Sequence, residues 1–379
     1  MALKQRRLRL GILGAGMIAT YPHGVLPNLT RIADRVELVA IASRSQDKAR
    51  AVAQDFGISE VYADLTAMLN GSDIDAVVNL TPIPVHFETS LQILEAKKHL
   101  VTEKPLCSTL EQADILIATA ERNGLLIVSA PIDMLMHDWQ RARRLVADGA
   151  IGRPAFARVQ SSHGGPALMG WPADPSWFYQ EGSGPLLDLG VYGLHRITGI
   201  LGPARRVTAF SGITRETRQA RGGPHDGLEI KVSEPDNTLM LLDFGDATFA
   251  SVDATFNVVA SKSPMVELYG SEGTLLVHYS TGDPAIDIFR MDAAPGTPGW
   301  ITPTTIGFPE KEDRAKLLHR AVLVEHLLDC LEQGSQPLLS AHHARHVLEI
   351  MLAARRSAET GRAVELTTSF IYPSEQASA

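Results

Sequence analysis

The chain has 379 residues, 45% of them hydrophobic and 21% charged, with a formal net charge of −8; this length exceeds the roughly 250–300 residues at which a single core usually stops growing, so we expect two domains. The acidic balance excludes the basic surface that nucleic-acid binding needs, and two cysteines are too few for a disulfide framework or a four-cysteine zinc site. Beyond the glycine-containing N-terminal stretch no apolar run reaches about 18 residues, so we expect a cytoplasmic protein with reduced thiols and no membrane span.

The first third of the chain alternates short β-rich runs with helical patterns. Most of the runs are nearly continuous in apolar residues, as strands covered on both faces of a parallel sheet should be. We expect residues 1–128 to form an α/β Rossmann domain with a doubly wound parallel sheet. The predicted strands are Leu8–Leu13, Val36–Ala42, Val61–Tyr62, Ala76–Leu80, Leu100–Thr102 and Leu125–Val128, with helices such as Ser45–Phe56 and Thr109–Asn123 between them.

A glycine-rich segment directly follows the first predicted strand. It reads Gly14-Ala-Gly16-Met17-Ile18-Ala19 and fits the dinucleotide-binding pattern G-x-G-x-x-G/A. In that pattern Gly14 permits a tight turn, Gly16 lets a pyrophosphate approach the backbone, and Ala19 allows close helix–strand packing. The N-terminus of the next helix would offer free N–H groups to the anion. We expect this segment to bind a nicotinamide dinucleotide; a purely structural glycine turn is the alternative.

The second predicted strand ends at Ser43 and Arg44. An acidic residue normally binds the ribose 2′-hydroxyl of NAD at this place. A hydroxyl and a guanidinium suit a 2′-phosphate instead. We therefore favour NADP and keep NAD as the alternative, in which Arg44 is a surface residue that stacks on adenine.

Glu103-Lys104-Pro105 closes the fifth predicted strand. In a doubly wound sheet the carboxyl ends of the strands line the ligand crevice. Lys104 is therefore placed to meet a substrate hydroxyl near the nicotinamide. The other interpretation is an ordinary surface ion pair between Glu103 and Lys104.

After Pro131 the pattern changes to consecutive strands without helices between them. Residues 129–379 are expected to form an α+β domain with a largely antiparallel, open sheet that binds substrate. Helices are predicted over His137–Ala147, Ala315–Gln333 and Ala341–Thr360, and a loop over Ala293–Pro309. The predicted strands are Ala155–Ser162, Arg206–Arg215, Thr238–Asp243, Ala247–Phe256, Pro264–Leu268, Thr274–His278 and Ile286–Met291.

Three polar residues follow one another at helical spacing in this second region. Asp188, Tyr192 and His195 stand at i, i+4 and i+7, which places them on one face of a helix. Such a row is either part of an active site or a satisfied polar stripe. The aromatic loop from Trp171 to Tyr179 likewise suits the C–H faces of a sugar, or tethers itself in the core.

The order and spacing of these motifs resemble the Gfo/Idh/MocA family of oxidoreductases over nearly the whole chain. The resemblance implies a nicotinamide-dependent enzyme that acts on a sugar, glycoside or cyclic polyol. It also implies a homodimer or homotetramer formed through the open face of the second sheet. It adds Thr81, Pro82, His86 and Glu103 to the cofactor contacts. The segments that carry the resemblance are the glycine turn, Thr81-Pro82 with His86, Glu103-Lys104-Pro105, the helix of Asp188 and Tyr192, and Val364-Glu-Leu after Glu359-Thr-Gly-Arg362.

One position departs from the commonest pattern of the family. Many relatives have D-x-x-x-H-x-x-D with histidine as the base, whereas this chain has D-x-x-x-Y-x-x-H at Asp188, Tyr192 and His195. Tyrosine there resembles the glucose–fructose oxidoreductase and dimeric dihydrodiol dehydrogenase branches, which use NADP. The departure puts in doubt any substrate inferred from the inositol dehydrogenases.

The resulting hypothesis is hydride transfer between the cofactor and a secondary alcohol or hemiacetal. Tyr192 would exchange the hydroxyl proton, with its pKa lowered from about 10 by the charge of Lys104. Asp188 would hold Lys104 or a substrate hydroxyl. His195 would bind another hydroxyl or act as the base instead.

The sequence leaves two other functions open and offers one candidate metal site. A non-catalytic regulator would keep the fold and bind without turnover, and a glycoside-cleaving enzyme would recycle its bound cofactor. His342 and His346 lie one helical turn apart, but no Glu or Cys completes a zinc pattern, so we expect no metal.

Overall fold

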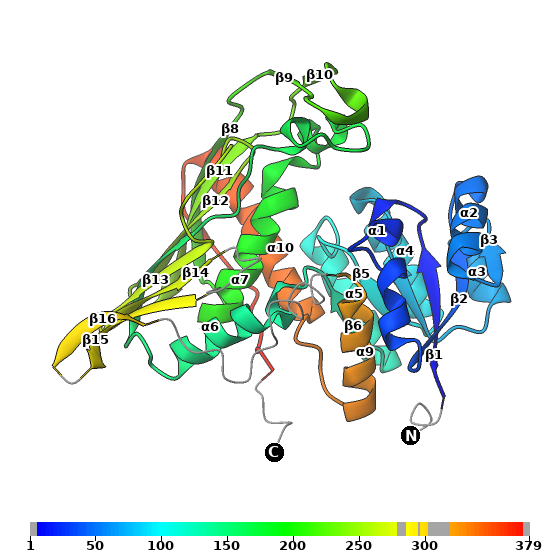
Figure 1. The fold of residues 1–379 in the computed structure, drawn as a ribbon, viewed down its shortest axis with the longest axis horizontal. Helices are drawn as coiled ribbons and strands as arrows, with labels where there is room; N and C mark the ends of the chain where they lie inside the picture. Colours follow the sequence, from blue (N-terminus) through cyan, green and yellow to red (C-terminus); the bar gives the residue numbers. More distant parts are fainter. Residues whose placement is uncertain (1–5, 279–285, 295, 302–318, 374–379) are drawn as a thin grey trace. The chain divides into compact units, whose positions relative to one another are not determined.

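The computed structural model describes residues 6–278, 286–294, 296–301 and 319–373. They form two compact units, shown in Figure 1. The first contains the described residues of Met1–Ile132, Glu312–Leu348 and Tyr372–Ala379, and the second those of Asp133–Lys311 and Glu349–Ile371. The described residues 319–348, which the sequence analysis grouped with the second domain, thus belong to the first unit.

The first unit contains a six-stranded parallel sheet in the order β3-β2-β1-β4-β5-β6. This is the strand order of a dinucleotide-binding fold, and it confirms the predicted doubly wound Rossmann domain. The strands are β1 (Leu8–Leu13), β2 (Val36–Ala42), β3 (Glu60–Tyr62), β4 (Ala76–Asn79), β5 (His99–Thr102) and β6 (Ile127–Ser129).

Local signals explain where the helices of this unit begin and end. Thr109 caps α5 (Leu110–Asn123) by accepting a hydrogen bond from the backbone of Gln112. Gly57 ends α2 (Gln46–Phe56) and Gly124 ends α5, both with positive φ. Late in the chain α9 packs against β5 and β6. The helices are α1 (Met17–Thr20), α2 (Gln46–Phe56), α3 (Leu65–Gly71), α4 (His86–Glu95), α5 (Leu110–Asn123) and α9 (Val322–Gln333), with a 3-10 segment at Leu26–Ile32.

The second unit contains a nine-stranded sheet in the order β16-β15-β14-β13-β7-β12-β11-β8-β17. Only the β7–β12 pair is parallel among these strands, so the predicted largely antiparallel sheet is confirmed. The strands are β7 (Pro154–Val159), β8 (Arg206–Gly212), β11 (Asn237–Gly245), β12 (Thr248–Thr255), β13 (Val266–Gly270), β14 (Gly273–Val277), β15 (Ile286–Ala294), β16 (Thr297–Ile301) and β17 (Val364–Glu365), and β9 (Thr217–Gln219) and β10 (Glu229–Lys231) form a separate pair.

Helices cover one face of this sheet. A π-helical turn, η7 (Leu186–Gly190), and the helix α7 (Val191–Leu201) pack on β12, while α6 (His137–Ala147) packs against β14. Residues from Glu349 onward in α10 (Ala341–Thr360) also belong to this unit. Strand side chains on the covered face are buried, whereas the opposite face exposes large apolar groups such as Phe210, which is 80% exposed.

The predicted loop over Ala293–Pro309 is wrong where the structure describes it. β16 pairs with β15, and the ring of Trp300 packs edge-on against Phe289 with centroids 5.5 Å apart. Pro298 is tolerated because β16 lies at the edge of the sheet. Residues 302–309 of the predicted loop and 315–318 of a predicted helix lie outside the described residues.

Within the described part of the chain, no helix combines the length and apolar character that a membrane span requires.

Candidate active site

The glycine turn after β1 is built as its pattern predicts. Gly14 has φ of +110°, and a Cβ at this position would lie 3.0 Å from the carbonyl oxygen of Leu80. Its N–H donates to the carbonyl of Ala42 at 2.9 Å. The turn is therefore held between the carboxyl ends of β1, β2 and β4, in a conformation that favours glycine.

Gly16 presents its backbone to open space. A Cβ built there would meet no atom within 4 Å, while Ala19 is fully buried. This geometry fits a pyrophosphate that approaches the backbone of the turn. Met17 and Ile18 lie in α1, directly after the turn.

The helix expected after the turn is only one turn long. α1 ends at Thr20 because Tyr21 precedes Pro22, and a residue before proline favours extended backbone. The chain then continues as the 3-10 segment Leu26–Ile32. A single turn contributes little macrodipole, so N–H groups of the turn itself would provide most of the binding to an anion.

At the end of β2, the backbone of Ser43 is held by hydrogen bonding, whereas Arg44 is exposed. The side-chain amide of Gln46 donates to the carbonyls of Ser43 and Tyr62 at 2.9 and 3.0 Å. This pins the end of the strand. Arg44 is exposed, and no ion pair joins it to the residues that the structure describes.

Buried polar side chains hold the loop that follows β4. The Asn79 side-chain amide donates to the hydroxyls of Thr89 and Ser90 at 2.8 and 3.0 Å, and its Oδ1 accepts from the Thr81 hydroxyl at 2.7 Å. Thr81 is thereby fixed at the carboxyl edge of the sheet, with Pro82 exposed beside it.

His86 connects this loop with the loop after β5. Its Nδ1 lies 2.8 Å from the carbonyl of Pro105 and its Nε2 lies 2.6 Å from the carbonyl of Thr81. The ring is 1% exposed, and both nitrogens face backbone oxygens. His86 therefore acts within this unit by holding two loops together, a role that the sequence analysis did not foresee.

Glu103 and Lys104 lie at the end of β5, in a loop that a distant arginine also contacts. Arg320 Nε lies 2.8 Å from Glu103 Oε1, and the backbone N–H of Lys104 donates to Oε2 at 3.3 Å. Burial alone raises the pKa of Glu103, which is 8% exposed, but the charges of Arg320 and Lys104 outweigh this and hold the pKa below its ordinary value. Sequence reasoning missed Arg320 because it lies 217 positions further along the chain.

The second unit carries the predicted acid–base row. Asp188 lies in the π-helical turn η7, and Tyr192 and His195 lie in α7. Asp188 and Tyr192 are half-buried, whereas His195 is 3% exposed. The structure therefore leaves two of the three predicted side chains accessible on this segment.

Arg196 extends this accessible row and was not predicted. Its guanidinium lies 6.0 Å from the centre of the Tyr192 ring and 4.9 Å from that of Trp139, and its Nε lies 2.5 Å from Asp133 Oδ1. Arg196 is thus a fixed cation beside the predicted acid–base tyrosine. Its position four residues after Tyr192 was the signal available in the sequence.

The aromatic loop between Trp171 and Tyr179 is largely a core element. Phe178 and Tyr179 are buried, and Trp171 packs edge-on against Phe178 with centroids 5.3 Å apart. Trp177 is 44% exposed. The interpretation as a loop tethered by core aromatics therefore fits most of its residues, and Trp177 remains available to a ligand.

The histidines of α10 show no metal-binding arrangement. His342 Nε2 lies 3.2 Å from Glu121 Oε1, and His346 is buried. Over the described ranges, no group of three or more His, Cys, Asp or Glu residues is arranged to hold a metal ion.

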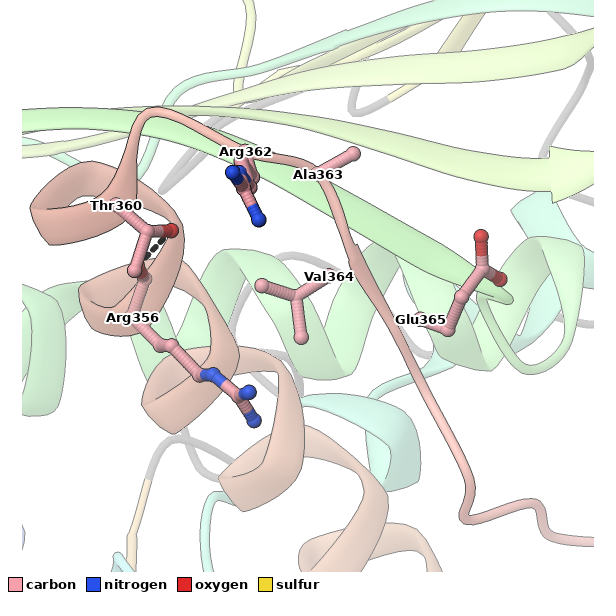
Figure 2. Close-up of a pocket in the computed structure, with 6 residues that line it drawn as sticks. All are labelled: Arg356, Thr360, Arg362, Ala363, Val364 and Glu365. Carbon is pink, nitrogen blue, oxygen red and sulfur yellow. Dashed lines mark hydrogen bonds between the residues drawn. The ribbon is translucent and has the colours of Figure 1, made fainter.

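A surface pocket of about 610 Å³ lies at the C-terminal end of α10 (Figure 2). It contains none of the predicted site residues. Its lining residues are Arg356, Thr360, Arg362, Ala363, Val364 and Glu365.

Comparison with known proteins matches both halves of the chain. Residues 8–130 match the GFO_IDH_MocA model, described as an oxidoreductase family with an NAD-binding Rossmann fold, and residues 139–276 match the GFO/IDH/MocA C-terminal domain. D-apiose dehydrogenase of Paraburkholderia graminis is 27% identical over 88% of this chain and 84% of its own length. An NADP-dependent scyllo-inositol 2-dehydrogenase of Bacillus subtilis is 23% identical over 96% of this chain and 98% of its own.

Solved structures show the same fold. A crystal structure of an NAD-binding oxidoreductase from Klebsiella pneumoniae superposes with a TM-score of 0.79 at 21% identity, covering 96% of this chain and all of that one.

Proposed function

This chain belongs to the Gfo/Idh/MocA family of nicotinamide-dependent oxidoreductases, and we propose that it transfers a hydride between the cofactor and a secondary alcohol or hemiacetal of a sugar, glycoside or cyclic polyol. The main support for the proposal is that the chain contains both parts of such an enzyme. The open glycine turn at Gly14 and Gly16 lies in one unit, and the accessible row of Asp188 and Tyr192 lies in the other. The sugar and polyol dehydrogenases among its relatives support the substrate class.

Bound nicotinamide would supply the hydride acceptor or donor. Tyr192 would exchange the proton of the substrate hydroxyl, and Lys104 would provide positive charge to the same hydroxyl. Asp188 would orient Lys104 or the substrate. Arg196, which is paired with Asp133, lies beside this tyrosine with its guanidinium 6.0 Å from the centre of the Tyr192 ring.

Tyr192 is a better acid–base group than His195. His195 is 3% exposed, so its ring is not accessible to a hydroxyl without movement of its surroundings. Tyr192 is only half-buried. We therefore assign the acid–base role to Tyr192.

The experiment that tests this function is a titration of the protein with NADPH and NADH by fluorescence, followed by an absorbance screen at 340 nm against sugars, glycosides and cyclic polyols. We expect tight dinucleotide binding and turnover on one class of substrate. Binding without turnover would favour a regulator. Release of sugar without net NADPH formation would favour a glycoside-cleaving enzyme with recycled cofactor, and failure to bind either dinucleotide would contradict the proposal.

NADP is the preferred cofactor in this proposal. Arg44 is exposed at the end of β2 beside Ser43, and a guanidinium and a hydroxyl together suit the 2′-phosphate. Arg44→Ala should weaken NADPH binding about 10- to 100-fold, as expected for loss of a hydrogen bond to a charged group, and leave NADH nearly unchanged. Arg50→Ala, on the exposed side of α2, is the control. Equal losses for both dinucleotides would favour NAD.

We also propose that the protein is a homo-oligomer. Phe210, Leu239, Leu241 and Phe249 are large apolar side chains exposed on the neighbouring strands β8, β11 and β12, and a second copy would cover them. Leu239→Lys with Leu241→Lys should lower the mass measured by light scattering, whereas Ile115→Lys, exposed on α5, should not. A monomeric wild type would contradict this proposal.

The two cysteines, Cys107 and Cys330, are free and buried. They are compatible with a reducing compartment, and we propose a cytoplasmic location.

A further inference from the structure

The hydroxyl of a serine from outside the helix enters the backbone hydrogen bonding of the segment that carries the predicted acid–base residues. Ser161, just after β7, donates through Oγ to the carbonyl of Leu189 at 2.5 Å, and the N–H of Gly193 donates to the same Oγ at 3.0 Å. Residues 189 and 193 are the pair that an uninterrupted α-helix would join directly by an i to i−4 hydrogen bond. The Ser161 hydroxyl therefore bridges the two ends of one turn of the helix.

The interruption coincides with a change of helix type. Residues Leu186–Gly190 form the π-helical turn η7, and the α-helix α7 begins at Val191. Insertion of a side chain into the hydrogen-bond ladder is a recognised cause of such a distortion, and π-turns are frequent at functional sites. Here the bridged residues flank the positions of Asp188 and Tyr192.

Small residues allow Ser161 to come this close. A Cβ at Gly193 would lie 2.7 Å from Ser161 Cβ and 2.9 Å from its Oγ, and a Cβ at Gly190 would lie 3.1 Å from Ala254 Cβ. The two glycines therefore bring the backbone of the segment into contact with the ends of β7 and β12. A larger residue at either position would displace the segment from the strands.

Asp253 fixes the backbone that carries Ser161. Its Oδ1 accepts a hydrogen bond from the Ser161 N–H at 2.7 Å and another from the Ser162 hydroxyl. The Ser162 hydroxyl in turn accepts from the N–H of Thr255 at 3.1 Å. Ser161 is itself buried, so its hydroxyl has no competing contact with bulk solvent and its position is set by the sheet.

We propose that Ser161 is a positioning residue that sets the orientation of Asp188 relative to Tyr192. A π-helical turn is wider than an α-helical one, so the rotation about the helix axis from one residue to the next is smaller. Residues four positions apart are therefore more nearly aligned along the helix axis. This brings Asp188 and Tyr192 onto the accessible side while His195 is buried. The catalytic part of this inference depends on the function proposed above; the structural part does not.

The test compares Ser161→Ala with Ser251→Ala. Ser251 lies on β12 and donates to the carbonyl of Ala157 at 3.5 Å. It is thus a serine of the same sheet whose hydroxyl bonds a neighbouring strand and not the helix. We expect Ser161→Ala to lower kcat about 10- to 100-fold through misplacement of the acid–base pair. The dissociation constant for NADPH should stay within twofold, because Ser161 does not belong to the unit of the glycine turn. Ser251→Ala should change neither.

A size exchange separates packing from hydrogen bonding. Ser161→Gly combined with Gly193→Ala restores the space between strand and helix but provides no hydroxyl. It should remain as slow as Ser161→Ala. Recovery of kcat in the exchange variant would show that volume alone places the helix and would overturn the inference.

A crystal structure of Ser161→Ala gives a result that does not need turnover. The inference requires residues 186–193 to rearrange, with a direct bond from Gly193 N–H to the Leu189 carbonyl and with Asp188 turned relative to Tyr192. A π-turn identical to that of the wild type would overturn it, even if the proposed enzymatic function were wrong. Lack of wild-type turnover together with a rearranged helix would instead contradict only the function.

Discussion

The loops of the first unit and the helix of the second unit hold their predicted site residues by different means. In the first unit, buried side chains such as Asn79, His86 and Arg320 fix backbone segments at the carboxyl ends of parallel strands. In the second, a hydroxyl from Ser161 opens one turn of a helix and so places two side chains. Several side chains therefore fix the loops, whereas a single hydroxyl, itself held in place by Asp253, bridges the helical row.

This difference predicts separate effects on dinucleotide affinity and on turnover. Changes in the loops should act first on dinucleotide affinity, since the proposed function has the phosphate groups bind at the edge that these loops form. Changes in the helical row should act on turnover and leave affinity intact.

The largest effect is expected for Tyr192→Phe. Loss of the group that we propose exchanges the substrate proton should lower kcat by about 10²- to 10⁴-fold, the usual contribution of general acid–base catalysis. NADPH affinity, measured by fluorescence titration, should not change. His195→Gln is the comparison, and its effect on kcat should be smaller. Near-normal turnover of Tyr192→Phe with cofactor bound would assign the proton transfer to another residue.

Gly14→Ala should affect binding rather than chemistry. The new Cβ would lie 3.0 Å from the Leu80 carbonyl oxygen, at a φ of +110°, and such strain costs about 1–3 kcal/mol. The dissociation constant for NADPH should rise roughly 5- to 150-fold, at about 1.4 kcal/mol for each factor of ten. At saturating NADPH, kcat should be largely restored.

Gly57→Ala is the matched control for that substitution. Gly57 also has positive φ, +69°, but a Cβ there meets no atom within 4 Å and the residue ends α2. We expect a loss of stability of about 1 kcal/mol, visible as a lower Tm, and unchanged NADPH binding. Equal weakening of NADPH binding in both variants would mean that general destabilisation, not the turn, sets affinity.

A smaller effect is expected for Arg320→Gln. In the wild type the pKa of Glu103 is held below its ordinary value, so the ionised form stabilises the folded state above the unfolded pKa, about 4.3, and this contribution is lost as pH falls through the lower folded pKa. Without Arg320, burial meets less opposing charge and the folded pKa of Glu103 rises. The variant should therefore be less stable than the wild type near neutral pH, and its stability should fall less on acidification. Melting temperatures between pH 3 and pH 7 measure this.

Arg35→Gln gives the reference for that experiment. Arg35 joins the first unit's N-terminal region to Asp329 and Glu332 of α9, but these carboxylates are 44% exposed, so their pairing should contribute little. A parallel pH profile for Arg320→Gln and Arg35→Gln would show that Arg320 has no special relation to Glu103. A moderate rise in the NADPH dissociation constant for Arg320→Gln alone would fit the division between loops and helix.

Local signals predicted many elements well. β1 and β2 have the predicted bounds, as do α6 and α10, because each is a long apolar or amphipathic run with a clear signal at its ends. β16 was missed since its Pro and Gly content is typical of a loop, and its pairing with β15 depends on a contact between Trp300 and Phe289. The contact, not local propensity, makes it a strand.

The sequence by itself determined the fold class, the glycine turn and the identity of the motif residues, because these follow from periodicity and from glycine's conformational freedom over a few neighbouring positions. Only the tertiary structure decided that Arg320 contacts Glu103, that His86 joins two loops and that Ser161 opens the helix before Tyr192. These contacts join residues that are from 5 to 217 positions apart, and their partners are selected by the packing of strands and helices, which no local pattern specifies.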